Sequence, residues 1–550
     1  MRIAITGCGV VSAIGEGVKE TEVSLRNERC GIGLAVFPGI GEQMVGKVNV
    51  DNEMLAKGLG IEGEMPRSVL LGIKAAREAL SMARVEDVSG MGFVNGTTVG
   101  GMDLTERHYD KIDKYKSLHL AETCSELIAK NTGIGGKTVT ISTACSSALN
   151  SIITASEMIR AGKVSRVMAG GTECLTMFHQ LGFMSLGIVD KERCRPFDAG
   201  RNGLNLGEGA AYIVIETEES AKERKAEILG YVAGYGNACD AYHQTATSEN
   251  GEGACMAMLK ALRMAGVEPE KIDYINAHGT STLDNDRSES VAIKRVFGEK
   301  PPMVSSTKGF TGHTTSASGA IETVISLVAM RNGFVPGNMN WGKSEEEMIE
   351  PVAHTMTRSV ETVMCNSFGF GGNESSVIIT MYPGRELEPI RETEVKEVVC
   401  VEKKEGDDCG KWIKPIEARR MTMQMRLVTV AACEALEKAG LEKPDAIITT
   451  TSLGMISNSM RILDGIENGE EVKPSLFMLS THNSISSMLA IRFGCHGYNC
   501  TYCSPEYAIE DAERLISEGE ARYVMLVEYE ENEKIWQYRA KTKVKIITGQ

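Results

Sequence analysis

Long apolar runs are absent from this chain of 550 residues, and none approaches the ~20 residues that a membrane-spanning helix requires. The first residues, MRIAITGCGVVSAIG, also lack the apolar core and the cleavage site of a targeting segment. They predict instead a buried strand over residues 3–6 that enters a glycine turn. We therefore expect a cytoplasmic protein without a membrane partner.

An excess of positive charge is also absent. The 59 Lys and Arg residues against 74 Asp and Glu residues leave a formal net charge of −15, which disfavours nucleic acid and anionic membranes as partners. A local basic patch could still bind an acidic partner protein. The 15 cysteines are scattered and no signal peptide precedes them, so we expect reduced thiols and no disulfide framework.

The composition and the pattern of the chain predict an α/β protein. Hydrophobic residues make up 42% and charged residues 24% of the chain, as in soluble globular proteins, and the length predicts roughly two to four folded units. Short apolar runs such as TVTIS and AAYIVIE alternate with helical patterns such as SVLLGIKAAREALSMA. The charged stretch 384–408 predicts a domain boundary, although VKEVVCV within it could be the first strand of the next unit.

The chain beyond this boundary resembles its own beginning. Three pairs of segments match in order, starting at Lys74 and Val430, at Gly92 and Ala446, and at Thr140 and Asn499. The third pair is loose in its first turn, but its helix and following strand match well. The simpler alternative is that any two strand–helix–strand units look alike. We favour an internal repeat.

Cys145 is the first candidate for chemistry. The strand TVTIS leads into Thr143-Ala144-Cys145-Ser146-Ser147, and small residues then begin an amphipathic helix. Unpaired backbone N–H groups and the helix dipole at such a junction stabilise a thiolate, so we expect a lowered pKa for this cysteine. The commoner fate of a cysteine is an inert buried thiol, which we expect for the others.

Two histidines lie in small, glycine-rich surroundings. His278 stands in NAHGTST and His313 in KGFTGH, where small neighbours allow another group to approach the ring. A single histidine would more often be structural. A cysteine nucleophile with two imidazoles is suited to acyl transfer, with hydrogen-bond donors directed at an enolate or oxyanion.

Charged residues and a glycine loop accompany the histidines. Lys308 precedes His313 by five residues, and Glu322 follows it in a predicted helix, so that both could bias the charge of the ring or form a structural ion pair. The segment SFGFGGN contains Phe370 in a glycine-rich loop that could lie against a ligand or move.

These motifs together resemble the elongating β-ketoacyl-[acyl-carrier-protein] synthases of the thiolase-like superfamily. The resemblance covers residues 1 to about 382, where TACSSA, NAHGTST, KGFTGH and SFGFGGN occur in the order and at the spacing of that family. It implies a thiolase-like fold with duplicated α-β-α-β-α layers, formed by residues 1–230 with the nucleophile and residues 231–383 with the two histidines. A C-terminal half-thiolase-like α/β module over 394–550 would follow.

The resemblance also implies roles for single residues. Cys145 would carry the acyl group as a thioester, and its backbone amide and that of Phe370 would form an oxyanion hole. His278 and His313 would stabilise the enolate formed when malonyl-carrier loses carbon dioxide. Lys308 would support the His313 side electrostatically and Glu322 the network structurally, while the Phe370 ring would gate the acyl pocket. A seventh residue, Arg195 in CRPFD, would contact the carrier protein.

The implied reaction needs no cofactor or metal, because both substrates are carried on the phosphopantetheine of acyl-carrier protein. Acyl-carrier and malonyl-carrier proteins would be the partners, and a homodimer is expected. The loop reads FGGN followed by Glu374 where better-known elongation enzymes have FGGT and then Asn, which, with LNLGEGAAY, is similar to synthases of aryl-polyene or flexirubin-type pathways. The acyl group could be fatty, polyene or aryl-primed.

The module over 394–550 resembles the N-terminal half of a synthase. Thr501-Tyr502-Cys503 lies near the position of TAC, but Pro505 and Glu506 replace small helix-opening residues and no histidine motif follows. We expect a non-catalytic lobe that shapes dimerisation or the acyl tunnel.

Other functions have weaker support. A non-catalytic partner subunit like a chain-length factor would lack the nucleophile that this chain has, and a biosynthetic thiolase would not need the two-histidine pair. Cys495, Cys500 and Cys503 have a ferredoxin-like spacing without a fourth cysteine, and a zinc site with His496 is disfavoured because the segment matches the repeat. A dinucleotide-binding site is also disfavoured, because Ser12 occupies the third glycine position of the motif for such a site.

Overall fold

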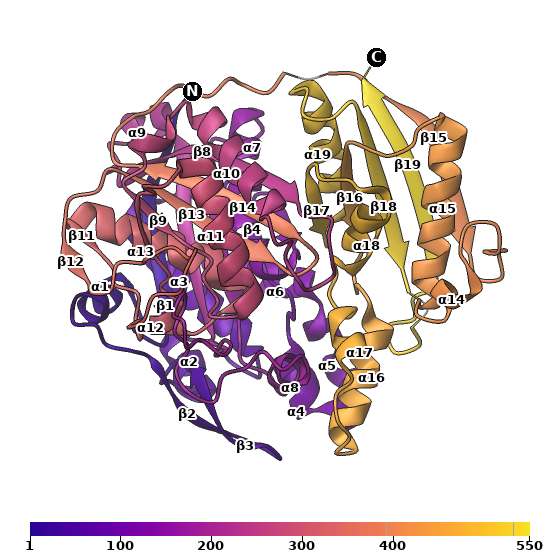
Figure 1. Ribbon diagram of the computed structural model, residues 1–550, viewed down its shortest axis with the longest axis horizontal. Coiled ribbons are helices and arrows are strands. Elements are labelled where there is room, and N and C mark those ends of the chain that lie inside the picture. Colours follow the sequence, from indigo (N-terminus) through magenta and orange to yellow (C-terminus); the bar gives the residue numbers. More distant parts are fainter. Residues whose placement is uncertain (392, 532, 550) are drawn as a thin grey trace.

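The computed structural model describes residues 1–391, 393–531 and 533–549, so the expected C-terminal module over 394–550 includes two residues outside the described part, at positions 532 and 550. Figure 1 shows two lobes, with the N-terminal lobe in indigo to salmon and the C-terminal lobe in orange to yellow. Among the described residues, no helix is long and apolar enough to cross a membrane.

One mixed sheet of fifteen strands runs through both lobes in the described part of the chain. In spatial order its strands are β10 (Met303–Ser305), β9 (Tyr274–Asn276), β13 (Thr362–Gly369), β14 (Asn373–Thr380), β8 (Gly230–Cys239), β1 (Ile3–Ser12), β7 (Gly209–Thr217), β6 (Arg166–Glu173), β4 (Gly92–Gly96), β5 (Thr138–Ile141), β17 (Asn499–Tyr502), β16 (Ala446–Thr450), β18 (Tyr523–Glu530), β19 (Lys541–Gly549) and β15 (Val395–Lys404).

The N-terminal lobe has five layers. Helix α3 (Arg67–Ala83) covers β1, β7 and β6 on one outer face. On the other side α10 (Glu252–Ala265) covers β8 and β14, and α11 (Leu283–Phe297) packs against α10. Between the two layers of strands lie α7 (Ser147–Arg160) and α13 (Ser318–Asn332), which are buried almost throughout because strands contact them on both sides. This is the α-β-α-β-α arrangement that the sequence predicts.

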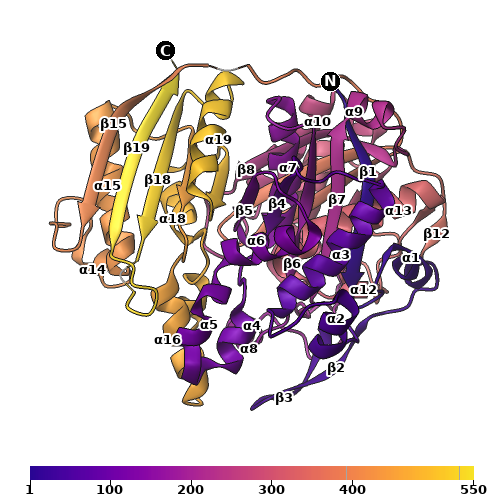
Figure 2. The same cartoon turned by 180° about the vertical axis from the view of Figure 1, so that it is seen from behind.

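The C-terminal lobe is a three-layer unit. Helices α15 (Met423–Ala439) and α18 (Ser484–Phe493) lie on one side of β15 to β19, and α19 (Pro505–Ser517) lies on the other (Figures 1 and 2). Its strand order from the junction, β17-β16-β18-β19-β15, reproduces the order β5-β4-β6-β7-β1 of the N-terminal lobe. The structure therefore contains the repeat expected from the sequence.

The equivalent strands of the two halves meet at the junction. Tyr502 of β17 pairs antiparallel with Ile141 of β5. Ser142 N donates to Thr501 O over 3.0 Å, and Cys503 N donates to Thr140 O over 2.9 Å. A contact between equivalent surfaces in antiparallel orientation has the geometry of a two-fold interface, here formed within a single chain.

Smaller helices position the active region below this junction (Figure 1). They are α4 (Met102–Arg107), α5 (Ile112–His119), α6 (Ala121–Thr132) and α8 (Met177–Ser185) of the N-terminal lobe, and α16 (Ile456–Glu467) and α17 (Pro474–Met478) of the C-terminal lobe. Gly182 of α8 allows α17 to approach closely, because a Cβ atom there would lie 2.2 Å from the Phe477 ring.

The remaining elements lie at the periphery or in short turns: α1 (Val18–Arg26), β2 (Ile32–Phe37), β3 (Gly41–Gly46), α2 (Asn52–Leu59), η1 (Tyr109–Lys111), η2 (Ala144–Ser146), α9 (Glu218–Glu223), η3 (Pro269–Lys271), α12 (Lys308–Thr311), η4 (Thr315–Ala317), β11 (Phe334–Val335), β12 (Met356–Thr357) and α14 (Pro415–Ala418).

Candidate active site

Cys145 lies in a tight turn between β5 and α7. Its neighbour Ala144 has φ 53°, a left-handed conformation that is costly for a residue other than glycine. The turn is held by Thr143 N, which donates to Ser147 Oγ over 2.9 Å, and by Ser147 Oγ, which donates to Ala144 O over 2.6 Å. These bonds fix the cysteine at the start of the helix, as the sequence predicts.

The two histidines converge on this cysteine from separate loops. His313 Nε2 lies 3.2 Å from Cys145 Sγ, and the rings of His278 and His313 are 5.3 Å apart at a steep angle. All three side chains are at least 95% buried, since Cys145 is 5% exposed and each histidine 2%. Thus the fold brings together three residues that are up to 168 positions apart in the sequence.

Lys308 and Glu322 form the second layer of the site. Their ion pair is almost completely buried, and Lys308 Nζ lies 3.3 Å from His278 Nδ1. The sequence prediction placed Lys308 on the His313 side, but its direct contact is with His278. An ammonium group has no acceptor, so His278 Nδ1 accepts this bond and the Nε2 atom of the neutral ring carries the proton.

Burial governs the protonation of the three central groups. It lowers the pKa of both His278 and His313 well below the usual value, and the charge of Lys308 adds to this effect. Burial also raises the pKa of the Cys145 thiol to about 12, against the opposing influence of Lys308. The expected lowering of this pKa by the helix start is therefore wrong, because desolvation outweighs the local dipole. A neutral thiol faces two neutral imidazoles.

The glycine loop packs directly on the cysteine. The backbone amides of Phe370 and of Cys145 itself both favour the thiolate and so oppose the rise in its pKa. Ser367 Oγ donates to Cys145 O over 2.9 Å, and a Cβ atom on Gly369 would lie 2.8 Å from Thr143 O. Glycine at position 369 therefore permits the contact that aligns these amides.

Two cavities meet at Cys145, and Phe370 and Phe183 line both of them. The two rings are stacked with their centroids 5.6 Å apart. The first cavity, here called the access cavity, continues past His278 and His313 and has polar lining residues, namely Asn202, Thr245, Thr247, Thr280, Thr282 and Asn285. The Phe370 ring, predicted to be a gate, thus lies at the boundary between two cavities.

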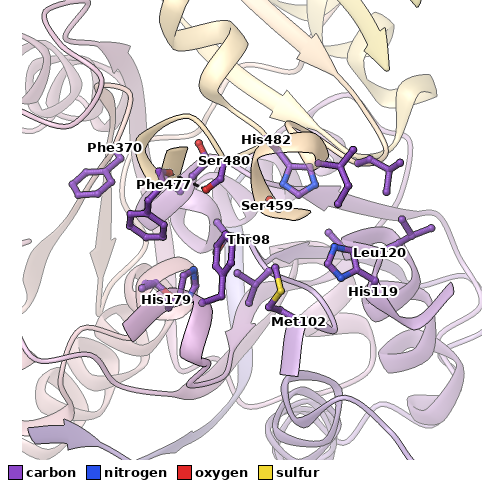
Figure 3. A pocket seen from close by; sticks show the side chains of 18 of the residues that line it. Thr98, Met102, His119, Leu120, His179, Phe370, Ser459, Phe477, Ser480 and His482 are labelled. Atoms are coloured by element: carbon purple, nitrogen blue, oxygen red, sulfur yellow. Dashed lines mark hydrogen bonds between the residues drawn. The ribbon is translucent and has the colours of Figure 1, made fainter. Parts of the chain in front are cut away.

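The second cavity, here called the inner cavity, extends between the two lobes (Figure 3). The N-terminal lobe contributes Val99, Met102, Phe178 and His179, whereas the C-terminal lobe contributes Leu453, Ile456, Phe477, Ser480 and His482. Figure 3 shows Phe370 and Phe477 on one side of the view and His119 and His482 on the opposite side. Most of the lining is apolar, which suits an acyl chain.

Several residues of this site were not predicted from the sequence. Glu289 on α11 accepts from the backbone N–H groups of His278 over 2.9 Å and Gly279 over 2.7 Å, and so holds the histidine loop. Asn483 of the C-terminal lobe donates to Phe370 O over 2.8 Å. Neither lies in a recognisable motif, and only the tertiary fold brings them to the site.

Two other candidates lie outside the two cavities. Arg195 forms an ion pair with Glu192, and its side chain is 26% exposed. Cys503 is fully buried and borders neither cavity. In the described part of the chain, one group of His, Cys, Asp and Glu side chains is close enough to share a metal ion, and it consists of Cys145, His278 and His313. The side chains of Cys495, Cys500 and Cys503 do not form such a group.

Comparison with known sequences matches most of the chain. The profile described as "Beta-ketoacyl synthase, N-terminal domain" matches residues 1–221 and 382–527, and that described as "Beta-ketoacyl synthase, C-terminal domain" matches residues 229–341. The chain is 33% identical to the 3-oxoacyl-[acyl-carrier-protein] synthase 2 of Vibrio cholerae over 68% of this chain and 98% of that protein. The enzyme of the same name from Staphylococcus aureus is 32% identical over 70% and 99%.

Solved structures extend the likeness. The ishigamide ketosynthase/chain length factor is 30% identical with a TM-score of 0.64, covering 69% of this chain and 99% of that chain. The PfaC keto synthase–chain length factor covers 100% of this chain and 78% of its own with a TM-score of 0.83. At 15% identity it shows a shared fold only, but that fold includes the C-terminal lobe.

Proposed function

Since the chain belongs to the β-ketoacyl synthase family, we propose that it condenses an acyl thioester on Cys145 with malonyl-[acyl-carrier protein], with loss of carbon dioxide. The observation that carries the proposal is the contact of 3.2 Å between Cys145 Sγ and His313 Nε2, with His278 beside them. Nucleophile and imidazoles at such distances are suited to acyl transfer.

The first step would be acylation of Cys145. As the sulfur attacks the carbonyl carbon of an acyl-carrier thioester, the thiol proton moves to His313 and then to the departing carrier thiolate. The developing oxyanion would be held by the backbone amides of Cys145 and Phe370, the two amides that also favour the thiolate. The acyl chain would then extend past Phe370 into the inner cavity.

The second step would form the carbon–carbon bond. When malonyl-carrier loses carbon dioxide, the negative charge of the enolate develops on its thioester oxygen, where His278 Nε2–H would donate a hydrogen bond and His313 would donate a second one after its proton moves from Nδ1 to Nε2. The enolate carbon attacks the Cys145 thioester, the C–S bond breaks, and the sulfur leaves as a thiolate that takes up one proton from water. Lys308 would keep His278 in the donating tautomer through its contact of 3.3 Å with Nδ1. Glu322 would balance the lysine charge.

The substrates would arrive on the phosphopantetheine of acyl-carrier protein, and we propose no other cofactor and no metal. The hydroxyl groups of Thr245, Thr247, Thr280 and Thr282 along the access cavity suit the amide groups of such an arm. Arg195, partly exposed, would contact the carrier protein. The acyl group, whether fatty, polyene or aryl-primed, stays a prediction, as does the cytoplasmic location.

The C-terminal lobe would act as a non-catalytic partner within the same chain. It pairs with the edge strand β5 and walls the inner cavity, and no histidine corresponding to His278 or His313 follows Cys503 in its sequence. The division at 1–230, 231–383 and 394–550 stays a prediction. A homodimer would have to use a surface other than the β5 edge, because β17 covers it.

The alternative of a wholly non-catalytic chain-length factor is not favoured. Such a subunit would lack the nucleophile, whereas Cys145 here lies against an imidazole. A biosynthetic thiolase is also disfavoured, because it would not need the two-histidine pair.

Incubation of the purified chain with acyl-carrier and malonyl-carrier proteins tests the proposal. A ketoacyl product two carbons longer than the starting acyl group should form, with release of carbon dioxide. Cys145→Ala should abolish acylation and leave malonyl decarboxylation, while His278→Ala should impair decarboxylation. Absence of product across all acyl chain lengths would contradict the proposal.

A further inference from the structure

Two histidines lie at the end of the inner cavity remote from Phe370 (Figure 3). His119 ends α5 in the N-terminal lobe, and His482 precedes α18 in the C-terminal lobe. They are near enough for His482 to influence the protonation of His119. Each lobe thus supplies one imidazole to the same part of the cavity.

These two rings retain hydrogen-bonding capacity. His482 Nδ1 is buried and has no direct hydrogen-bond partner in the described part of the chain, although the backbone of Ser452 also interacts with this ring and opposes the fall in its pKa. His119 Nδ1 is bonded to Thr105 Oγ1 at 2.8 Å, which leaves Nε2 for another partner. A buried polar atom without a partner costs about 1–3 kcal/mol, so a ligand that pairs with it is favoured.

Several other polar groups on the cavity wall are already engaged, although Thr315 Oγ1 is buried without a partner in the described part of the chain. Ser480 Oγ donates to Phe477 O over 2.8 Å, Thr481 Oγ1 is bonded to Ser484 Oγ at 3.0 Å, and Thr98 Oγ1 donates to Glu173. The aromatic rings near Phe370 pack on each other, with Phe477 and Phe183 5.2 Å apart. His179 packs among these rings, so the acyl chain would pass a mostly apolar stretch with one imidazole before it reaches His119 and His482.

Both imidazoles are uncharged near neutral pH, since burial lowers the pKa of His119 and of His482 to about 4. A neutral imidazole has one donor and one acceptor and matches a hydroxyl or carbonyl oxygen. A carboxylate would lose its hydration without gaining an opposite charge. Both rings are packed, because the His119 and Trp536 ring centroids are 5.2 Å apart and Gly454 lies so close to His482 that a Cβ atom there would be 2.9 Å from His482 Cγ.

We propose that His119 and His482 select acyl groups with a neutral oxygen, a hydroxyl or a ketone, near the end distant from the thioester. This inference rests on the proposed function, because the acyl chain must enter from Cys145. The C-terminal lobe would then determine which acyl groups are accepted, and would do more than close the cavity.

The test compares acylation of Cys145 in the full chain, followed by intact mass, with carrier-bound acyl chains of six to twelve carbons. Each chain is offered unsubstituted, with a terminal hydroxyl, with a ketone beside the terminal methyl, and with a terminal carboxyl. At one length the hydroxyl or ketone form should load about 3- to 10-fold faster than the unsubstituted form, as one net hydrogen bond implies. The form that loads faster shows whether the site accepts a hydroxyl or a ketone oxygen.

Variants identify the residues responsible. His482→Phe and His119→Phe keep the ring volume and should bring that ratio close to one, whereas His482→Gln should keep part of it. His354→Phe, whose side chain is 84% exposed, is the matched control and should keep the ratio. If a Phe variant fails to fold, the inference is still tested by the unmodified protein, through the way in which the ratio of loading rates depends on acyl chain length.

A ratio near one at every length, a preference for the carboxyl form, or an unchanged ratio in both Phe variants would overturn the inference while leaving the proposed function intact. Failure to load any acyl group would instead contradict the proposed function, and the inference with it.

Discussion

Each half of the repeat carries a cysteine after the equivalent strand, three residues later in the N-terminal half than in the C-terminal half, but only one of them has chemical neighbours. Cys145 follows β5 and faces His313 Nε2 at 3.2 Å, at the meeting point of two cavities. Cys503 follows β17, is fully buried, and has its pKa raised by burial and by the nearby carboxyl groups of Glu122 and Glu530. A strand followed by a helix is therefore not sufficient to make a cysteine a nucleophile. The cysteine also needs the partners that distant loops supply.

The same comparison separates two tasks. The N-terminal lobe holds every group proposed to touch the reacting atoms, whereas the C-terminal lobe contributes cavity wall, a contact to the Phe370 loop and the remote imidazole of His482. A repeat that lost its chemistry could keep its strand pairing, because that pairing depends on backbone hydrogen bonds and burial.

Removal of the Cys145 thiol, compared with removal of the Cys503 thiol, gives the largest expected effect. Cys145→Ala should abolish covalent acylation, a loss of at least about 1,000-fold, because no other thiol in the cavities can replace the nucleophile. Cys503→Ala should still be acylated. Intact mass after incubation with acyl-carrier protein measures both, and an acyl adduct that disappears with Cys503→Ala alone would invert the comparison.

A buried charge network joins the halves and should dominate their stability. Arg514 on α19 is 5% exposed and forms ion pairs with Glu157 of α7 at 3.1 Å and with Asp511 at 2.9 Å. Arg514→Leu should lower the free energy of unfolding by about 3–5 kcal/mol, because it removes the guanidinium group that the buried carboxyl groups of Asp511 and Glu157 share.

Urea unfolding followed by circular dichroism measures this change. Lys541→Gln is the control, since its pair with Glu528 is exposed, and it should alter stability by about 1 kcal/mol or less. Equal effects of the two substitutions would show that the network between the halves contributes no special stability.

The raised pKa of the Cys145 thiol can be tested by alkylation. With a pKa of about 12 the thiolate fraction grows tenfold per pH unit, so the rate of alkylation by iodoacetamide should rise by about 100-fold between pH 7 and pH 9. Peptide mass spectrometry of the Cys145 adduct follows this rate. A plateau within that range would instead support the lowered pKa that the helix start alone suggests.

The sequence predicts what short motifs and periodicity determine. The α/β layers, the repeat and the candidate trio of Cys145, His278 and His313 could all be read from local patterns. The direction of the Cys145 pKa could not, since it depends on burial by segments far along the chain. Nor could the contact of Lys308 with His278, because spacing along the chain suggested His313 instead.

Contacts between the lobes were also beyond the sequence. His482 and Asn483 lie in a short segment without a motif, more than 100 positions from Phe370. They reach the cavity only because β17 pairs with β5 and thereby fixes the position of one lobe against the other. Residues selected by tertiary proximity leave no periodic or compositional signal.

Asn483 offers the finest test of how far the catalytic half depends on the other. Its side chain donates to Phe370 O over 2.8 Å, and a Cβ atom on Gly371 would lie 2.8 Å from its Nδ2 atom, so the loop is both bonded and tightly packed. Asn483→Ala removes the bond and should lower kcat/KM for condensation by about 5-fold, since one hydrogen bond to a positioned loop contributes ~1 kcal/mol. Asn468→Ala, in an exposed turn of the same lobe, should leave it unchanged. Equal rates for Asn483→Ala and the unmodified protein would mean that the N-terminal lobe positions its gate unaided.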